Sequence, residues 1–273
     1  MTDSINSLIR TAFAASMVFL FSASAGAQHK IAITAHRGFW NCEAAGYSEN
    51  SIASLREAQE AGLWGSEFDV HLTADNKPLV NHDSTRGGKE IEQTKLRYFK
   101  TVDICRLKNR EWPSTLNEYL KQGQASDKTV LVYELKPEKY RSEDLLIKKS
   151  VRMLKRHGLF DPSRVIFISF SKHMCDVIAQ KYPEFTNQYL NGDISPADLK
   201  KDGINGIDYH YNVLYKHPEW VSQAHSLGMS VNVWTVNSEK DIQAVIDLGV
   251  DCITTNEPLL VRKLLGDKEL VIK

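Results

Sequence analysis

Short apolar runs rich in β-branched residues alternate with longer segments of helical periodicity along most of this chain. Eight such runs predict strands, at residues 31–35, 66–70, 130–133, 165–168, 185–190, 206–209, 231–235 and 251–254. Helical patterns lie between them, at residues 51–61, 114–121, 142–157, 173–181, 218–227 and 238–248. The alternation predicts a closed parallel TIM (β/α)8 barrel. The alternative is a doubly wound open sheet, but the Gly-rich phosphate turn expected after its first strand is missing.

The connection after the second run is too short for a crossover helix. Residues 74–77 alone separate two apolar stretches, so the chain must turn back on itself as a β-hairpin extension of the barrel. A two-residue turn at Asp75-Asn76 would place Asp69 opposite His82 on one face of the ribbon. A slip of one residue would send His82 to the other face, so this register is a testable prediction.

Length and composition fit one globular domain of barrel size. The chain has 273 residues, of which 42% are hydrophobic and 25% charged, and no linker or shift in composition divides it. Residues 28–273 are therefore predicted to form a single domain. The 34 basic and 34 acidic residues cancel, with a sequence pI near 7.1, and no basic stripe interleaved with aromatics is visible. This balance argues against a nucleic-acid partner and confines any attraction for an anion to a local site.

The first residues predict an export signal rather than part of the fold. Residues 1–10 carry one cation, residues 11–25 are mostly small and apolar, and Ala25-Gly26-Ala27 matches the small-x-small pattern that signal peptidases read. We therefore expect a signal peptide at residues 1–27 and a mature protein that is periplasmic or secreted. The apolar run is shorter than the roughly 20 residues of a membrane span, so stable membrane insertion after cleavage is not expected.

Export gives the four cysteines a choice of states. Cys42, Cys105, Cys175 and Cys252 form no Cys-x-x-Cys element, which argues against a zinc site or a dithiol redox centre. In an oxidising compartment Cys42 and Cys105 are the pair better placed to bridge, because both fall in loop-like stretches. Four free and mostly buried thiols are the alternative. The sequence leaves both open.

Polar residues suited to phosphate chemistry stand at the carboxyl ends of the first three predicted barrel strands. His36 follows the first strand, Glu67 and Asp69 end the second, and Glu134 ends the third. Loops at this end of a parallel barrel carry the chemistry, and the hairpin returns His82 to the same rim. Glu67 and Asp69 are two residues apart, so both carboxylates point to one side of their strand and could hold a cation together with Glu134. Ligation by oxygen alone favours one divalent cation, Ca²⁺ or Mg²⁺, over zinc.

Ordered short motifs along the chain resemble those of the glycerophosphodiester phosphodiesterase family. They read His36-Arg37-Gly38, Glu49-Asn50-Ser51, Glu67-Phe68-Asp69, His82-Asp83, Glu134-Leu135-Lys136 and Trp234-Thr235-Val236-Asn237. The match spans essentially all of the mature chain, and the motifs occur in the family's order at the right separations. The resemblance implies a TIM-barrel enzyme that hydrolyses glycerophosphodiesters, as small-molecule substrates, to glycerol 3-phosphate and an alcohol with the help of a metal ion.

The resemblance also implies a role for each motif residue. By position, His36 and His82 match the family's acid-base pair, Arg37 and Lys136 match its phosphate-binding cations, and the three carboxylates match its metal ligands. The chemistry agrees, because phosphoryl transfer needs neutralised phosphate oxygens, a base for the nucleophile and an acid for the leaving alkoxide. Which histidine is acid and which is base stays open. Two titrating imidazoles predict a bell-shaped pH profile with limbs near neutrality, unless neighbouring charges displace them.

The alcohol side of the substrate is the least defined part of this prediction. The loop from Phe39 to Ser48 is longer and more aromatic than the compact turn of the family, so the pocket for the alcohol is expected to differ. Trp234 ends a strand at the rim, where it either packs on the substrate glycerol or plugs the barrel.

Other functions have different hallmarks. A related phospholipase D-like enzyme or lyase acting on lysophospholipids would yield a cyclic phosphate or need a membrane-facing apolar rim, which Phe39 and Trp40 leave possible. A noncatalytic exported phosphodiester-binding protein would form no product, and the intact set of acid, base and metal groups argues against it. Zinc-dependent amidohydrolase chemistry on the same barrel is set aside, because its His-x-His pair occurs nowhere in the chain.

Overall fold

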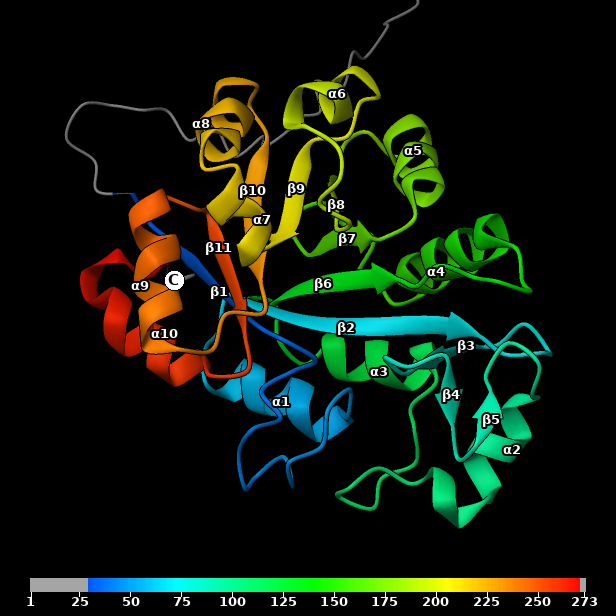
Figure 1. The fold of residues 1–273 in the computed structure, drawn as a ribbon. Helices are drawn as coiled ribbons and strands as arrows, with labels where there is room; N and C mark the ends of the chain where they lie inside the picture. The colour runs from blue at the N-terminus through cyan, green and yellow to red at the C-terminus, as the bar shows by residue number, and fades with distance from the viewer. Residues whose placement is uncertain (1–28, 271–273) are drawn as a thin grey trace, which may run out of the picture.

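The computed structural model describes residues 29–270 and shows a closed barrel of parallel strands (Figure 1). The barrel strands are β1 (Ala32–Ala35), β2 (Gly65–Leu72), β6 (Val130–Leu135), β7 (Val165–Ser169), β8 (Thr186–Tyr189), β9 (Gly206–His210), β10 (Ser230–Trp234) and β11 (Cys252–Thr255). Neighbours follow the order β1-β11-β10-β9-β8-β7-β6-β2, and β1 pairs with β2 to close the ring. The predicted TIM barrel is confirmed, and its closure excludes the open doubly wound sheet.

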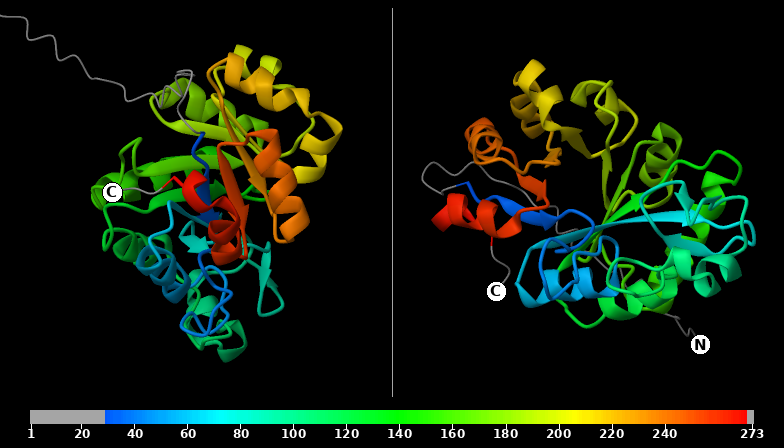
Figure 2. Two further views of the ribbon diagram at one scale, coloured as in Figure 1. Left: turned by 90° about the vertical axis from the view of Figure 1, so that its left-hand side faces the viewer. Right: turned by 60° about the horizontal axis from the view of Figure 1, so that its bottom comes forward.

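Helices cover the outside of the barrel (Figure 2). They are α1 (Ile52–Glu60), α3 (Leu116–Gly123), α4 (Glu143–Arg156), α5 (Lys172–Lys181), α6 (Pro196–Lys201), α7 (Tyr211–Lys216), α8 (Glu219–Ser226), α9 (Glu239–Leu248) and α10 (Pro258–Leu265), followed by the 3₁₀ turn η2 (Gly266–Lys268). A Ser hydroxyl caps several of them by accepting a backbone N–H of the first turn, as Ser51 does for α1 and Ser238 for α9. The sequence did not predict α6, α7 and α10. Helices α6 and α7 have six residues each, fewer than two turns, and α10 has eight.

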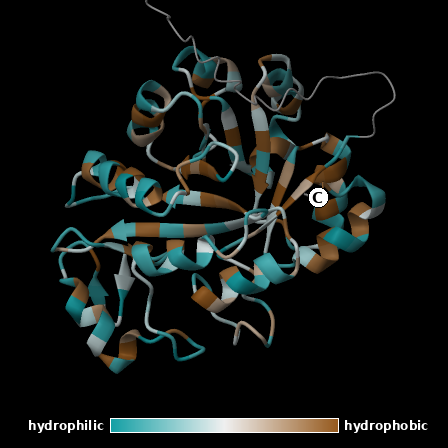
Figure 3. Ribbon diagram, turned by 180° about the vertical axis from the view of Figure 1, so that it is seen from behind, coloured by the Kyte–Doolittle hydropathy of each residue, from teal (hydrophilic) through white to brown (hydrophobic). Residues whose placement is uncertain are grey.

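Side chains along the barrel strands alternate between two environments. In β2 and β6, Phe68 and Tyr133 point outward and pack beneath the helices together with Phe167 of β7. Residues of the opposite parity, such as Val132 and Ile168, fill the barrel interior. Figure 3 shows apolar residues concentrated in the strands and polar residues on the outer faces of the helices. The inward-facing set therefore continues, at the carboxyl ends of the strands, into the candidate site.

The hairpin after β2 exists, but its predicted register is wrong by one residue. Strand β3 (Pro78–Val80) runs antiparallel to β2 with Val70 opposite Val80, and beyond it the Asn81 N–H donates to the Asp69 carbonyl at 3.0 Å. Asp69 therefore faces Asn81 rather than His82. The cause is the turn, in which Asn76 adopts a left-handed conformation (φ 56°) and a third residue joins the loop. Asparagine tolerates this region better than most residues, which makes the longer turn accessible.

A small lobe follows the hairpin, at the lower right of Figure 1. It contains β4 (Thr85–Arg86), β5 (Lys89–Glu90), α2 (Leu96–Thr101) and the 3₁₀ turn η1 (Asp103–Cys105). Cys105 packs in the core of this lobe beside Phe99, while the Cys42 thiol donates to the Phe39 carbonyl oxygen at 3.3 Å. All four cysteines are free thiols, so the bridge considered between Cys42 and Cys105 is not formed.

Some sequence predictions lie outside the part of the chain that the structure describes. The signal peptide at residues 1–27 falls there, so export and the boundary of a single domain at residue 28 stay predictions. Within residues 29–270, no helix is both long and apolar enough to cross a membrane.

Candidate active site

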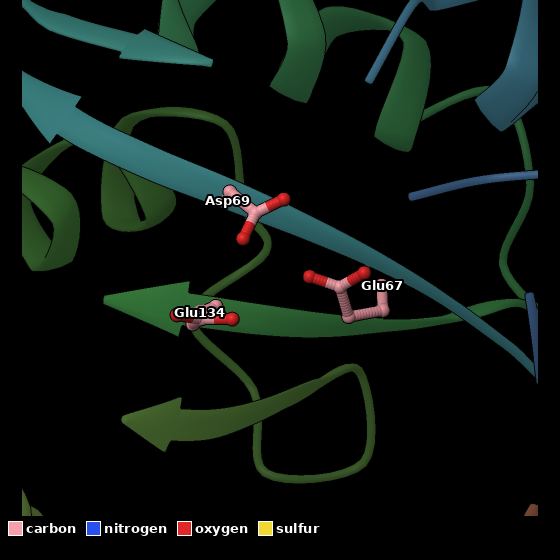
Figure 4. Close-up of side chains that lie close together, drawn as sticks. All are labelled: Glu67, Asp69 and Glu134. Carbon is pink, nitrogen blue, oxygen red and sulfur yellow. The ribbon is translucent and has the colours of Figure 1, made fainter. Parts of the chain in front are cut away.

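Three buried carboxylates from two adjacent strands converge at the rim of the barrel. Glu67 and Asp69 lie on β2 and Glu134 lies on β6, where Asp69 and Glu134 are register partners. One carboxylate oxygen from each lies within 4.8 Å of the others, and Figure 4 shows the three groups turned toward a common space. The parallel register, together with the two-residue spacing of Glu67 and Asp69, produces this convergence.

The carboxylates are held at considerable electrostatic cost. Burial and the charges of Asp69 and Glu134 raise the pKa of Glu67 well above its usual value. Burial, followed by the charge of Asp69, raises the pKa of Glu134 to about 8. Burial also opposes ionisation of Asp69, but Lys136 and His82 outweigh it and hold the pKa of that carboxyl well below its usual range.

This arrangement fits a divalent cation. Glu67 Oε2 accepts the Arg37 backbone N–H at 2.7 Å, whereas its buried Oε1 finds no hydrogen-bond partner among the described residues. A buried carboxylate oxygen without a hydrogen-bond donor is costly. Three converging carboxylates provide oxygen ligands for a metal ion, which would offset this cost. The oxygen-only donor set suits Ca²⁺ or Mg²⁺.

Both predicted phosphate-binding cations adjoin the carboxylates. The Lys136 ammonium lies 2.7 Å from Glu134 Oε1 and 3.2 Å from Asp69 Oδ1. The Arg37 guanidinium donates to the Glu49 carboxylate. Arg37 and Gly38 both have positive φ (57° and 79°), so the chain turns sharply after β1 and brings the Arg37 N–H to Glu67. Gly38 is required there, since a Cβ would also collide with the Ser54 side chain.

The imidazole of His36 is held in a single tautomer. Its Nδ1 lies 2.8 Å from Asn256 Oδ1, which also accepts the Trp40 indole N–H at 3.2 Å. Because an indole nitrogen only donates, the shared Asn256 atom is the oxygen, and His36 Nδ1 must carry the proton. His36 Nε2 is then free to accept a proton. Burial, reinforced by the Arg37 charge, lowers the pKa of His36 to about 4, so the ring is neutral near pH 7.

His82 reaches the same site by a different route from the one predicted. It lies beyond the paired part of β3, where strand alternation no longer sets its direction, yet its charge is among those that depress the pKa of Asp69. Its Nδ1 lies 2.8 Å from the Asp83 carboxylate, and its carbonyl oxygen lies 3.2 Å from His71 Nε2. The side chain is 37% exposed, so His82 is the more open of the two histidines.

Trp234 lies at the carboxyl end of β10 and is half-buried. Its indole N–H donates to the Asp208 carbonyl at 2.9 Å, and its ring meets Phe170 and His210 edge-on at centroid distances of 5.5 and 5.2 Å. This aromatic group faces the same rim as Lys136, whose ammonium lies 5.9 Å from the Phe170 ring centroid. A role for Trp234 in binding substrate stays a prediction.

Neutral residues brace the charged ones, and sequence reasoning did not find all of them. Asn50 donates to Asp69 Oδ2 at 2.8 Å and accepts the Asp69 backbone N–H at 3.2 Å. Asn256 holds His36 across 220 positions of sequence, and its own N–H is held by Asn237 Oδ1 at 2.9 Å. Asn50 and Asn237 lie within short motifs that the sequence analysis quoted, whereas the only sequence signal of Asn256 was its position just after a strand. Ser51, beside Asn50, caps α1.

A parallel barrel that carries clustered carboxylates, two cations and two imidazoles at the carboxyl ends of its strands has the equipment of an enzyme acting on phosphate esters. The glycerophosphoryl diester phosphodiesterase family model matches residues 36–260. The protein therefore belongs to this family, and the predicted enzyme class, glycerophosphodiester phosphodiesterase, is confirmed with it.

Individual relatives agree with this assignment. A solved glycerophosphodiester phosphodiesterase from Parabacteroides distasonis is 40% identical, with a TM-score of 0.82, over 89% of this chain and 99% of that one. A phosphodiesterase from Oleispira antarctica, solved in complex with the product sn-glycerol-3-phosphate, is 25% identical with a TM-score of 0.69, over 86% of this chain and 96% of that one. The glycerophosphodiester phosphodiesterase of Caldanaerobacter subterraneus is 25% identical over 84% of this chain and 95% of its own length.

Proposed function

We propose that the protein hydrolyses glycerophosphodiesters to glycerol 3-phosphate and an alcohol, with His36 and His82 as the proton-transfer groups. A divalent cation, Ca²⁺ or Mg²⁺, is held by Glu67, Asp69 and Glu134. The observation that carries the proposal is the convergence of these three buried carboxylates, one oxygen of which lacks a donor, beside the two predicted cations. The product found in the Oleispira antarctica relative supports the choice of glycerol 3-phosphate.

A divalent cation held by Glu67, Asp69 and Glu134 would supply positive charge beside the phosphate oxygens. The protein's own cations act on the same phosphate. Lys136 is oriented by Glu134 and Asp69, and Arg37 is oriented by Glu49. Each cation is therefore positioned before substrate arrives, and little reorganisation is needed as negative charge builds up in the transition state.

His36 is suited to be the general base. Asn256 keeps the proton on Nδ1, and burial keeps the ring neutral, so Nε2 offers its lone pair to the attacking hydroxyl. The attacking group is water or a hydroxyl of the substrate glycerol. In the second case the alcohol leaves as a cyclic phosphate forms, and water then opens the ring. Proton removal by His36 serves either nucleophile.

His82 is suited to be the general acid. The Asp83 carboxylate accepts from Nδ1 and leaves Nε2–H for the departing alkoxide. Because the side chain is partly exposed, it can regain its proton from solvent between turnovers. The two histidines therefore have different environments: His36 is buried and neutral, whereas His82 is partly exposed and lies beside a carboxylate. This difference assigns the base to His36 and the acid to His82.

The lipid-directed alternative gains little support from the two aromatic residues that kept it open. Trp40 donates its indole N–H to Asn256, and Phe39 packs against the hydrophobic core. Both side chains are half-buried, and neither is among the exposed large hydrophobic residues of the described chain. A soluble glycerophosphodiester is the substrate that the site supports best.

The test is to incubate the mature protein with glycerophosphocholine and glycerophosphoethanolamine, with chelator or with added Ca²⁺ or Mg²⁺, and to measure glycerol 3-phosphate. We expect product that disappears with chelator and returns with metal. His36→Ala and His82→Ala should abolish turnover, whereas His157→Gln, at the end of α4, should leave it intact. Turnover that persists in both catalytic-site variants would refute the assignment.

A further inference from the structure

A cavity borders the candidate phosphate site, and part of its wall comes from the loop after β1 that departs from the family pattern. It has a volume of about 250 Å³, and its walls include Tyr47, Glu49, Arg86, Arg106 and Lys108. The long loop after β1 supplies one wall, and the lobe after β3 supplies the other. Glu49 also binds the Arg37 guanidinium, so the cavity directly adjoins the cation predicted to bind phosphate.

The cavity is strongly positive. It is lined by three cations and one carboxylate, and that carboxylate, Glu49, already pairs with Arg37. Within residues 29–270, neither Arg86 nor Lys108 forms an ion pair with a carboxylate, and Arg106 pairs only with Asp103, which is 79% exposed. An anion entering the cavity would therefore meet positive charge that the protein itself does not neutralise.

Neutral contacts help to hold each cation in place. Arg86 donates to Asn81 Oδ1 at 2.6 Å and to the Cys105 carbonyl at 3.0 Å. The Arg106 guanidinium lies 3.8 Å from the Trp112 ring centroid, and the Lys108 ammonium lies 4.9 Å from that of Tyr47. Stacking on aromatic rings restricts long side chains while leaving their charge available.

The two walls are also fastened to each other. Asn109 donates its backbone N–H to Ser48 Oγ at 2.6 Å and its amide to the Ala45 carbonyl at 3.3 Å. Glu111 accepts the N–H groups of Ile52 and Ala53 at the start of α1, at 2.9 and 3.2 Å. The cavity is thus built into the fold, and an occupant does not have to order its walls.

We propose that this cavity binds an anionic group on the alcohol half of the substrate. The enzyme then prefers glycerophosphodiesters whose alcohol bears a carboxylate or a phosphate over those whose alcohol is choline or ethanolamine. This inference rests on the proposed function, because it assumes that the diester phosphate is bound at Arg37. A carboxylate or a phosphate would meet the two cations that lack a carboxylate partner, Arg86 and Lys108, together with the stacked Arg106.

Glycerophosphoserine and glycerophosphoethanolamine provide a matched test, because the two diesters differ only by a carboxylate. We expect kcat/KM to favour the serine diester, and Lys108→Gln or Arg106→Gln to reduce that preference by about 1.5-fold to fivefold, as for partly exposed ion pairs. Raising the ionic strength should reduce the preference as well. Lys200→Gln, an exposed lysine at the far end of α6, is the control and should keep the wild-type ratio.

Affinity measured by calorimetry in the presence of chelator separates this proposal from the proposed function. Suppose that neither diester is hydrolysed in the assay with added metal, but that the serine diester binds more tightly and Lys108→Gln removes this difference in affinity. The proposed reaction then fails and the anionic subsite stands. If both diesters are hydrolysed with equal kcat/KM, or the ratio is the same in Lys108→Gln and Lys200→Gln, the subsite is refuted while the reaction stands. Equal affinities of wild type for both diesters refute the subsite whatever the turnover.

Discussion

Replacing Glu134 by Gln should weaken the decrease in the free energy of unfolding of the metal-free protein as pH rises. The same change removes one of the three proposed metal ligands. Glu134 is 6% exposed and its pKa is about 8, against an ordinary value of 4.5. The folded state therefore holds this proton over a range in which the unfolded state has lost it, so the free energy of unfolding falls as pH rises. For this one group the fall amounts to about 2 kcal/mol between about pH 6 and about pH 8. Gln at position 134 carries no such proton, so the variant should lack this component.

The assay is urea unfolding of wild type and Glu134→Gln in the presence of chelator, at both pH values. Groups that titrate elsewhere, such as His225, contribute equally to the two proteins and cancel in the comparison. Lys136 keeps its contact with Asp69 in the variant, which limits the loss of other interactions. An identical pH dependence in the two proteins would show that Glu134 is ionised throughout this range, and the electrostatic account of the carboxylate cluster would be wrong.

Three further changes test separate parts of the structure. Metal at about a hundredfold its Kd should raise the free energy of unfolding of wild type by about 2.7 kcal/mol, measured by calorimetric melts. Glu67→Gln should remove most of that gain. An equal gain in both proteins would exclude Glu67 as a ligand. His82→Gln should lower kcat by about 10² to 10⁴, measured as glycerol 3-phosphate release, and a loss below tenfold would remove His82 from proton transfer. Asn76→Gly should preserve or raise stability while Asn76→Ala lowers it by about 1 kcal/mol in urea unfolding, because Asn76 has a φ of 56°. Equal stability of the two Asn76 variants would contradict the left-handed turn.

Strand and helix periodicity predicted the barrel because both patterns are local. Each barrel strand alternates within four to eight residues, and the same alternation indicated that Glu67 and Asp69 share a face. The hairpin register depended on one backbone conformation, that of Asn76, which residue type permits but does not dictate. A two-residue and a three-residue turn differ there by little in sequence and by one full residue in pairing.

The braces of the site were out of reach for a different reason. The three carboxylates can be recognised in the sequence because they end apolar strands, where an unpaired charge is costly; they are Glu67, Asp69 and Glu134. Asn50 and Asn256 carry no charge, and asparagine is common in loops. The role of Asn50 appears only when the loop after β1 folds against Asp69 of β2. The role of Asn256 appears only when the barrel closes and brings β11 beside β1, so that the residue after β11 meets the residue after β1. Such contacts are a property of topology rather than of any short motif.

The surroundings of His36 shift the expected pH profile. Burial and the Arg37 charge lower the pKa of His36, and the hydrogen bond to the neutral Asn256 raises it too little to offset them, so the acid limb of activity should lie near the pKa of about 4 rather than near neutrality. Asn256→Asp would keep an oxygen acceptor for His36 Nδ1 but add a negative charge, which favours the imidazolium and raises the pKa. We expect the acid limb of kcat/KM to move up by about one pH unit or more, with most activity retained well above it. If the variant is active and its limb does not move, His36 is not the base, and the proton must be removed by another group at the rim.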